Sequence, residues 1–261
     1  MDISLIIPLV AGWVAGWIVN YLADVLPATR RLSPPSCPQC NTPHPWKNYL
    51  LFRSCRHDHA RSLRTWLTPL VLTALSAYAW LQPPKFGYWL GLAVLLYFGV
   101  VFVIDMEHRL ILHPTSIAGS LLGLGVGLAS NGPLPTLLGG LAGLLILLVL
   151  YYLGVLFSSM RARRMRARGL EADDEPALGF GDVTLAAILG LMLGWPLIWF
   201  GLLVGVLLAG FFGVFVVIFM LVIRRYKENA LMIFMPYGPF LVLSAFLIMF
   251  LPSLIAAILP R

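Results

Sequence analysis

The chain has 261 residues, of which 60% are hydrophobic and only 11% are charged. A soluble domain has about a quarter charged residues, so this chain cannot cover itself with polar surface, and we expect most of it to lie in lipid. The net charge is +7, but the basic residues lie between apolar segments and form no soluble basic face, which argues against nucleic acid as a partner.

Apolar segments of about 20 residues, enough to cross a bilayer, follow one another along the chain. We therefore predict an all-α, polytopic membrane protein with about eight transmembrane helices. These helices cover residues 3–26, 66–82 and 86–104, two stretches within 110–160, two within 183–223, and 230–251. Turn signals at Ser130–Pro133 and Gly194–Pro196 divide the two long apolar runs. The first segment lacks a basic residue before it, so we expect it to remain as an anchor rather than to be cleaved as a signal peptide.

The basic residues favour one side of these helices. Sixteen of the eighteen Lys and Arg fall in the loops after the first, third, fifth and seventh predicted helices, and only Lys85 and Arg261 fall elsewhere. Because positively charged loops stay in the cytoplasm, we expect these four loops inside the cell, both termini outside, and the protein in the inner membrane. The basic and then acidic stretch Arg161–Glu175 is predicted to be a solvated, mobile loop.

Two aspartates lie at the cytoplasmic ends of predicted helices. Asp105 ends the third helix and Asp182 starts the sixth, so the two carboxylates would meet if these helices pack side by side. A close carboxylate pair shares one proton, which leaves one base and one acid to activate water against an amide. The alternative is that both are helix caps or surface groups, which is how we interpret Asp24 and Glu107.

Two glycines lie beside the second aspartate, in the string Gly179-Phe-Gly-Asp182. Because Gly179 and Gly181 lack side chains, a substrate strand can approach their backbone closely, and unusual dihedral angles are permitted there. This string resembles the start of the second signature of type IV prepilin peptidases, which here extends to Trp195, and Ile104–Leu110 resembles the first signature.

The resemblance continues at Met235–Phe240 and at Gly12–Pro27, which are similar to the last and first helices of that family. It implies an aspartyl protease of the Gly-x-Gly-Asp class, with Asp105 and Asp182 as the catalytic pair. Such enzymes remove the basic leader from type IV prepilins and pseudopilins at the cytoplasmic face of the membrane. Many also methylate the new N-terminus with S-adenosylmethionine. The family often has a proline where this chain has Leu112.

A polar loop at residues 27–65 contains all three cysteines, Cys37, Cys40 and Cys55. An odd, clustered set favours reduced thiols that bind metal, and structural zinc takes four Cys, His or acidic ligands. The family resemblance puts the fourth ligand position at Asp58. Other candidates for it are His44, His57 and His59. A metal-free loop is the alternative, and we expect any zinc here to be structural.

These features divide the chain into a first transmembrane helix (1–26), the cysteine loop (27–65) and a seven-helix protease core (66–261). A transporter with a proton relay is a rival interpretation, but transporters usually show internal repeats and helices broken near the midplane, which are not visible here. A non-catalytic scaffold would leave the Gly-x-Gly-Asp string unexplained. A related protease that acts on preflagellins is poorly separated by sequence alone.

Overall fold

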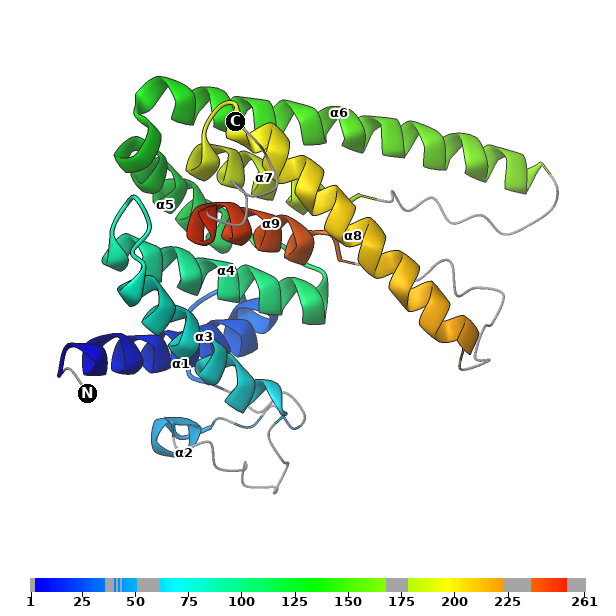
Figure 1. Cartoon of the computed structure of the whole chain (residues 1–261). Coiled ribbons are helices and arrows are strands. Elements are labelled where there is room, and N and C mark those ends of the chain that lie inside the picture. The colour runs from blue at the N-terminus through cyan, green and yellow to red at the C-terminus, as the bar shows by residue number, and fades with distance from the viewer. Residues whose placement is uncertain are drawn as a thin grey trace. The chain divides into compact units, whose positions relative to one another are not determined.

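The computed structural model describes residues 3–35, 40, 42, 44–50, 62–167, 178–222 and 236–252. These residues form a short 3-10 helix, Ile3–Leu5, and nine α-helices, and contain no strand, so the predicted all-α class is confirmed (Figure 1). The α-helices are α1 (Ile6–Thr29), α2 (Trp46–Leu50), α3 (Arg64–Leu81), α4 (Tyr88–His108), α5 (His113–Asn131), α6 (Pro133–Arg166), α7 (Phe180–Leu193), α8 (Leu197–Val222) and α9 (Gly238–Phe250).

Each of the eight predicted segments corresponds to one helix, with α2 as an addition inside the cysteine loop. Both predicted turns are confirmed. Gly132 separates α5 from α6 with φ 81°, and Gly194 ends α7 with φ 74°. A side chain is strained at such positive φ values, which explains glycine at both turns.

The basic block that was predicted to be a loop is partly helical. α6 continues from Met160 through Arg166, because Arg, Ala and Met all have high helix propensity and cations are favourable near a helix C-terminus. The second half of Arg161–Glu175, from residue 168 on, lies outside the described residues.

Four of the described helices are long and apolar enough to cross a bilayer, namely α1, α4, α6 and α8. Their outward faces carry many large apolar side chains, such as Leu153, Phe157, Phe211 and Phe215. Contiguous apolar surface of this kind is rare on soluble monomers but is well solvated by lipid tails. The chain is therefore a multi-pass membrane protein.

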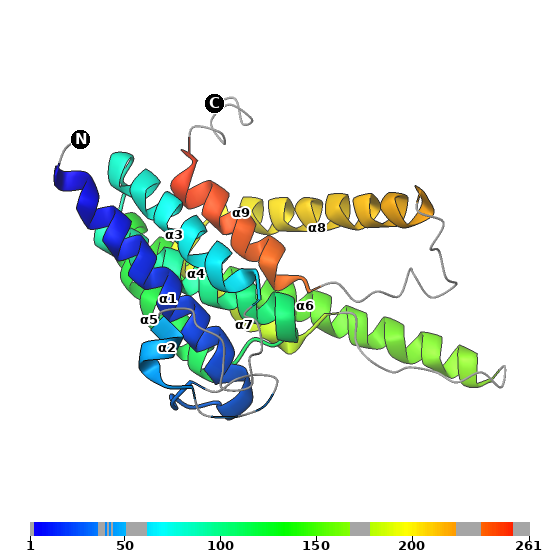
Figure 2. The same cartoon turned by 90° about the horizontal axis from the view of Figure 1, so that it is seen from below.

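The chain forms two compact units, Met1–Leu122 and Gly123–Arg261. In the first unit, α1 packs against α3 and α4, and α3 contacts α4 (Figure 2). The α1–α3 contact is close because of Gly12 and Gly16. A methyl group added at Gly12 would lie 2.6 Å from the Thr73 Cα atom, and one at Gly16 would collide with Pro69. Small residues four positions apart are the usual means by which membrane helices approach closely.

The second unit has its most extensive contact between α6 and α7. The same spacing of small residues occurs on both helices, with Gly139 and Gly143 on α6 and Ala186 and Gly190 on α7. A methyl group at Gly139 would lie 2.7 Å from the Gly194 Cα atom, and one at Gly143 would lie 2.9 Å from the carbonyl carbon of Ala186. Backbone-to-backbone packing thus fixes α7, the helix that carries Asp182, against α6.

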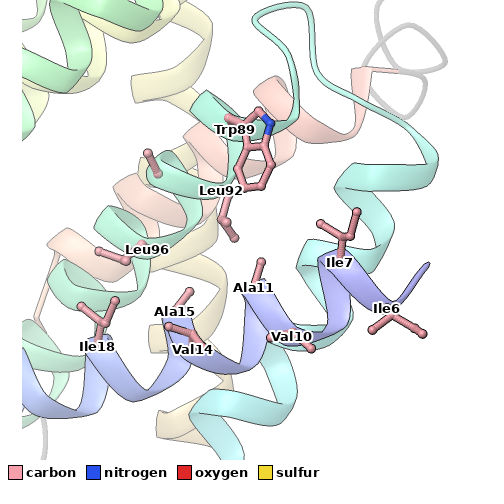
Figure 3. A pocket seen from close by; sticks show the side chains of 11 residues that line it. Ile6, Ile7, Val10, Ala11, Val14, Ala15, Ile18, Trp89, Leu92 and Leu96 are labelled. Atoms are coloured by element: carbon pink, nitrogen blue, oxygen red, sulfur yellow. The ribbon is translucent and has the colours of Figure 1, made fainter. Parts of the chain in front are cut away.

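An apolar groove of about 650 Å³ lies between α1 and α4 in the first unit. Figure 3 shows the small side chains of Ala11 and Ala15 on the side of α1 that faces Leu92 of α4. Trp89 lies at the same groove, and no titratable side chain lines it. The groove therefore offers apolar contact only and no group for catalysis.

Candidate active site

Asp105 lies in the last turn of α4 and is only 5% exposed. The helix extends past the predicted end at residue 104, and it closes when Arg109 adopts a left-handed conformation (φ 55°) and donates its backbone N–H to the Asp105 carbonyl oxygen at 2.9 Å. Such a left-handed residue satisfies one of the carbonyls that a helix end leaves without a partner. The backbone of Asp105 is therefore fixed by the cap that ends its own helix.

The turn after Asp105 forms without the proline that is common in the resembled family. Leu112 is buried in its place, and its carbonyl oxygen accepts the Ser116 N–H at 2.9 Å and the Thr115 hydroxyl at 2.7 Å. These bonds start α5 at His113, so the next helix begins normally. His108 and His113 are both exposed at this turn.

Asp182 lies in the first turn of α7 and is 9% exposed. Its Oδ2 atom accepts the backbone N–H of Gly179 at 3.2 Å, and its own N–H donates to the Gly179 carbonyl at 3.1 Å. This is the carboxylate half of a capping box. An acidic side chain is also favourable at a helix N-terminus because of the helix dipole.

The two glycines do not have the unusual dihedral angles that the sequence led us to expect. Gly179 has φ −77° and ψ 147°, an extended conformation that any residue adopts before a helix, and Gly181 belongs to α7 and has no positive φ. The Gly179 backbone is exposed next to the Asp182 carboxylate, and glycine leaves it without a side chain that would cover it. The prediction of close backbone approach remains open.

Tyr237, which no sequence motif marks as a site residue, lies close to Asp182. It directly precedes α9, and α9 packs against α7 (Figure 1). Burial and the negative charge of Asp182 raise the pKa of Tyr237 to about 12. Tyr237 therefore stays neutral at working pH and adds a phenol to the surroundings of Asp182. Only its place in the Met235–Phe240 segment could have indicated this from sequence.

Asp105 and Asp182 belong to different compact units. The structure therefore describes the surroundings of each carboxylate by itself. Each is buried at one end of a well-defined helix, and the pairing of the two remains a prediction.

Asp24 and Glu107, interpreted as membrane-edge charges, have a common partner in Arg64. Arg64 pairs with Asp24 through Nη2, and its Nη1 atom donates to Glu107 Oε2 at 3.1 Å. Asp24 also accepts the Tyr49 hydroxyl at 2.7 Å. In the sequence Arg64 is only one of the basic residues between two apolar segments, and no local pattern indicates its two partners.

The predicted zinc ligands lie mostly outside the described residues. Cys37, Cys55 and Asp58 fall there, whereas Cys40 is described, with its Sγ atom 3.0 Å from the Thr42 hydroxyl. Within the described ranges no three His, Cys, Asp or Glu side chains gather as metal ligands do. His44, one of the alternative ligands, is buried beside Tyr49, with ring centroids 6.0 Å apart.

Comparison with known proteins identifies the chain. Residues 89–260 match the sequence model of the type IV leader peptidase family. No curated protein and no solved structure matches significantly. The matched region covers more than half of the 261 residues and includes both Asp105 and Asp182. The protein therefore belongs to the type IV leader peptidase family.

Proposed function

We propose that the protein is an aspartic endopeptidase that removes the basic leader from type IV prepilins and pseudopilins, with Asp105 and Asp182 as its catalytic pair. The observation that carries the proposal is the family match over residues 89–260, which contains both aspartates. Their burial at the ends of α4 and α7 supports it, because the exclusion of bulk water strengthens the electrostatic interactions of a catalytic group.

The reaction follows from one proton shared between two carboxylates. The ionised aspartate takes a proton from water as the water oxygen attacks the scissile carbonyl carbon. The protonated aspartate donates a hydrogen bond to the carbonyl oxygen and stabilises its developing charge. Collapse of the tetrahedral intermediate then breaks the C–N bond, and the leaving amine takes the proton that the first aspartate accepted from water.

The substrate peptide has to be extended at the cut, since a helix buries its amide groups in hydrogen bonds. The exposed backbone at Gly179, 3.2 Å from the Asp182 carboxylate, is suited to receive such a strand. The apolar segment of the substrate remains in the bilayer beside the enzyme, while its basic leader crosses the cytoplasmic rim.

The orientation in our proposal has eight spans, both termini outside and the four basic loops in the cytoplasm. The length of α6 supports one part of this orientation, the placement of its arginine end outside the hydrocarbon layer. At about 1.5 Å per residue its 34 residues extend for roughly 51 Å, well beyond the ~30 Å hydrocarbon layer. The excess lies at the end that carries Arg161, Arg163, Arg164 and Arg166, where cations meet the headgroups and the cytoplasm.

Zinc in the cysteine loop is a further part of the proposal. Three thiolates from Cys37, Cys40 and Cys55 with Asp58 or a histidine form a donor set that suits tetrahedral zinc. Bound zinc would supply folding energy to a short polar loop and take no part in peptide cleavage. Methylation of the new N-terminus with S-adenosylmethionine rests on the family resemblance alone.

One experiment tests cleavage and methylation together. Purified enzyme in liposomes is incubated with a prepilin, and the product mass is measured. We expect a leader-sized loss, and a further methyl increment only if the methylation proposal is correct. Asp105→Asn and Asp182→Asn should lower the cleavage rate by about three orders of magnitude or more, the scale for removing one member of a catalytic unit.

The matched control is Asp173→Asn, a same-sized change nine residues before Asp182 in the sequence, which should cleave at the wild-type rate. Full processing by either the Asp105 or the Asp182 variant would overturn the catalytic assignment.

A further inference from the structure

Four side chains from four helices form a continuous chain in the first unit. The Tyr49 hydroxyl of α2 donates to Asp24 Oδ2 of α1 at 2.7 Å. Arg64 at the start of α3 binds the other oxygen of Asp24 through Nη2, and it donates to Glu107 Oε2 of α4 through Nη1 at 3.1 Å. The cysteine loop, through α2, is thereby connected to the end of α4.

The links of Asp24 to Tyr49 and to Arg64 are more shielded than the link of Arg64 to Glu107. The Arg64 and Asp24 side chains are 19% and 13% exposed, whereas Glu107 is 41% exposed. Arginine is suited to this position because its planar guanidinium directs separate N–H groups at two carboxylates. An ion pair as exposed as Arg64–Glu107 adds little stability. It does link the last turn of α4 to the first turn of α3.

The turn that Arg64 holds is the one that carries Asp105. Glu107 follows Asp105 by two residues in the last turn of α4. Residues two apart on a helix point in different directions, so Arg64 acts on Asp105 through the backbone of this turn rather than by contact. Helix ends fray unless something ties them down. Two attachments secure this end, namely the Arg109 cap and the Arg64–Glu107 bond.

At the Tyr49 end of this series of hydrogen-bonded side chains, α2 packs against α1 through aromatic contacts. The rings of Trp46 and Tyr21 lie 5.2 Å apart, and the ring of Tyr49 lies edge-on to Tyr21 at 6.4 Å. Tyr49 lies between Cys40 and Cys55 in the sequence. The α2 segment between these two cysteines therefore carries the hydroxyl that donates to Asp24.

We propose that Arg64 is a positioning residue for Asp105, and that the Tyr49–Asp24–Arg64–Glu107 chain couples the cysteine loop to the catalytic turn. This inference rests on the proposed peptidase function. The chain holds the turn in the arrangement that cleavage needs, and loss of a link releases the turn while leaving the helices packed.

The first test measures kcat and KM for prepilin cleavage by Glu107→Gln, Arg64→Gln and Arg64→Lys. Misplacement of a catalytic group by about 1 Å costs roughly 100-fold. We therefore expect kcat to fall about 10- to 100-fold in the first two variants, with KM within about threefold of wild type. Lysine reaches one carboxylate at a time, so Arg64→Lys should give an intermediate kcat.

Two further variants test the coupling. The double variant Arg64→Gln/Glu107→Gln should be no slower than the slower single variant, because both break the same link. Tyr49→Phe removes only the hydroxyl that joins the loop to Asp24 and should lower kcat several-fold. The control Arg31→Gln removes an exposed positive charge after α1 and should cleave at the wild-type rate.

A readout that needs no substrate separates this inference from the proposed function. Hydrogen–deuterium exchange of the folded variants should be faster at residues 103–110 in Glu107→Gln and Arg64→Gln, and unchanged in α6 and α7. If the wild-type enzyme cleaves no prepilin, the proposed function is wrong. Hydrogen–deuterium exchange would still test whether the Tyr49–Asp24–Arg64–Glu107 contacts hold the turn. Glu107→Gln with wild-type kcat and wild-type exchange, or a loss of folded protein alone in Arg64→Gln, would overturn the positioning role. Wild-type kcat in Tyr49→Phe would overturn the coupling to the loop.

Discussion

The contact between α6 and α7 offers the sharpest test of how the fold places Asp182. Gly190 of α7 lies against the backbone of Gly139 on α6. A methyl group at Gly190 would lie 2.8 Å from the Gly139 carbonyl carbon and closer still to its oxygen. Since ordinary van der Waals contact begins at 3.4 Å, Gly190→Ala must separate the two backbones by at least about 0.6 Å.

The magnitude follows from this displacement. Overpacking by one carbon costs about 1–3 kcal/mol, offset by up to about 1 kcal/mol because alanine favours a helix more than glycine does. Asp182 lies eight residues before Gly190, about 12 Å along α7. If α7 moves as a rigid rod, Asp182 shifts by a similar fraction of an ångström, so we expect kcat for prepilin cleavage to fall about tenfold.

The assay compares thermal unfolding and cleavage kinetics in the same detergent for Gly190→Ala and for Gly154→Ala. Gly154 lies on α6 with no atom within 4 Å of an added methyl group, so its alanine variant should match or exceed the wild-type protein in Tm and cleave normally. Equal Tm and equal kcat for the two variants would refute the claim that backbone contact between α6 and α7 positions Asp182.

Three further predictions concern the pH dependence of stability, the hydrogen bond of a buried asparagine and the zinc content of the protein. Burial and Asp182 raise the pKa of Tyr237 to about 12, whereas an unfolded tyrosine ionises near pH ~10. Between these values the unfolded chain binds fewer protons, so stability falls as pH rises. Tyr237→Phe should flatten this fall in Tm, and an unchanged slope would contradict the assignment. Asn20 donates from Nδ2 to the buried Thr65 carbonyl at 3.0 Å, so Asn20→Ala should destabilise the protein by about 1–3 kcal/mol in denaturant titration, and no loss would count against this bond. Elemental analysis should find about one zinc per chain, the ratio for a single structural site, and Cys37→Ser should lose it. A metal-free wild-type protein would reject the site.

The helices could be read from sequence because their signals are local. Uninterrupted apolar length predicts a helix in lipid, and Gly132 and Gly194 mark turns by their own backbone preference. The ends of the helices could not be read as accurately, because a few more residues with high helix propensity extend a helix at little cost in free energy. α4 thus includes Asp105, and α6 includes the arginines up to Arg166.

The candidate site residues could be placed at helix ends from the sequence, but their surroundings could not. Asp105 and Asp182 were identified as charges at helix ends and by their motifs, and both are buried there. The Asp182 contact with Gly179 follows from local capping geometry, whereas the proximity of Tyr237 to Asp182 depends on α9 packing against α7. The two residues are far apart in the sequence, and no local pattern connects them.

The sequence by itself determined the membrane class, the order of the helices and the family, since each depends on composition or on short contiguous motifs. The tertiary structure decided which face of each helix is buried and which partners the polar side chains have. In helices that are apolar all round, hydrophobic periodicity does not distinguish one face from another. Only packing shows that Gly139 meets Gly190, or that Arg64 joins Asp24 to Glu107.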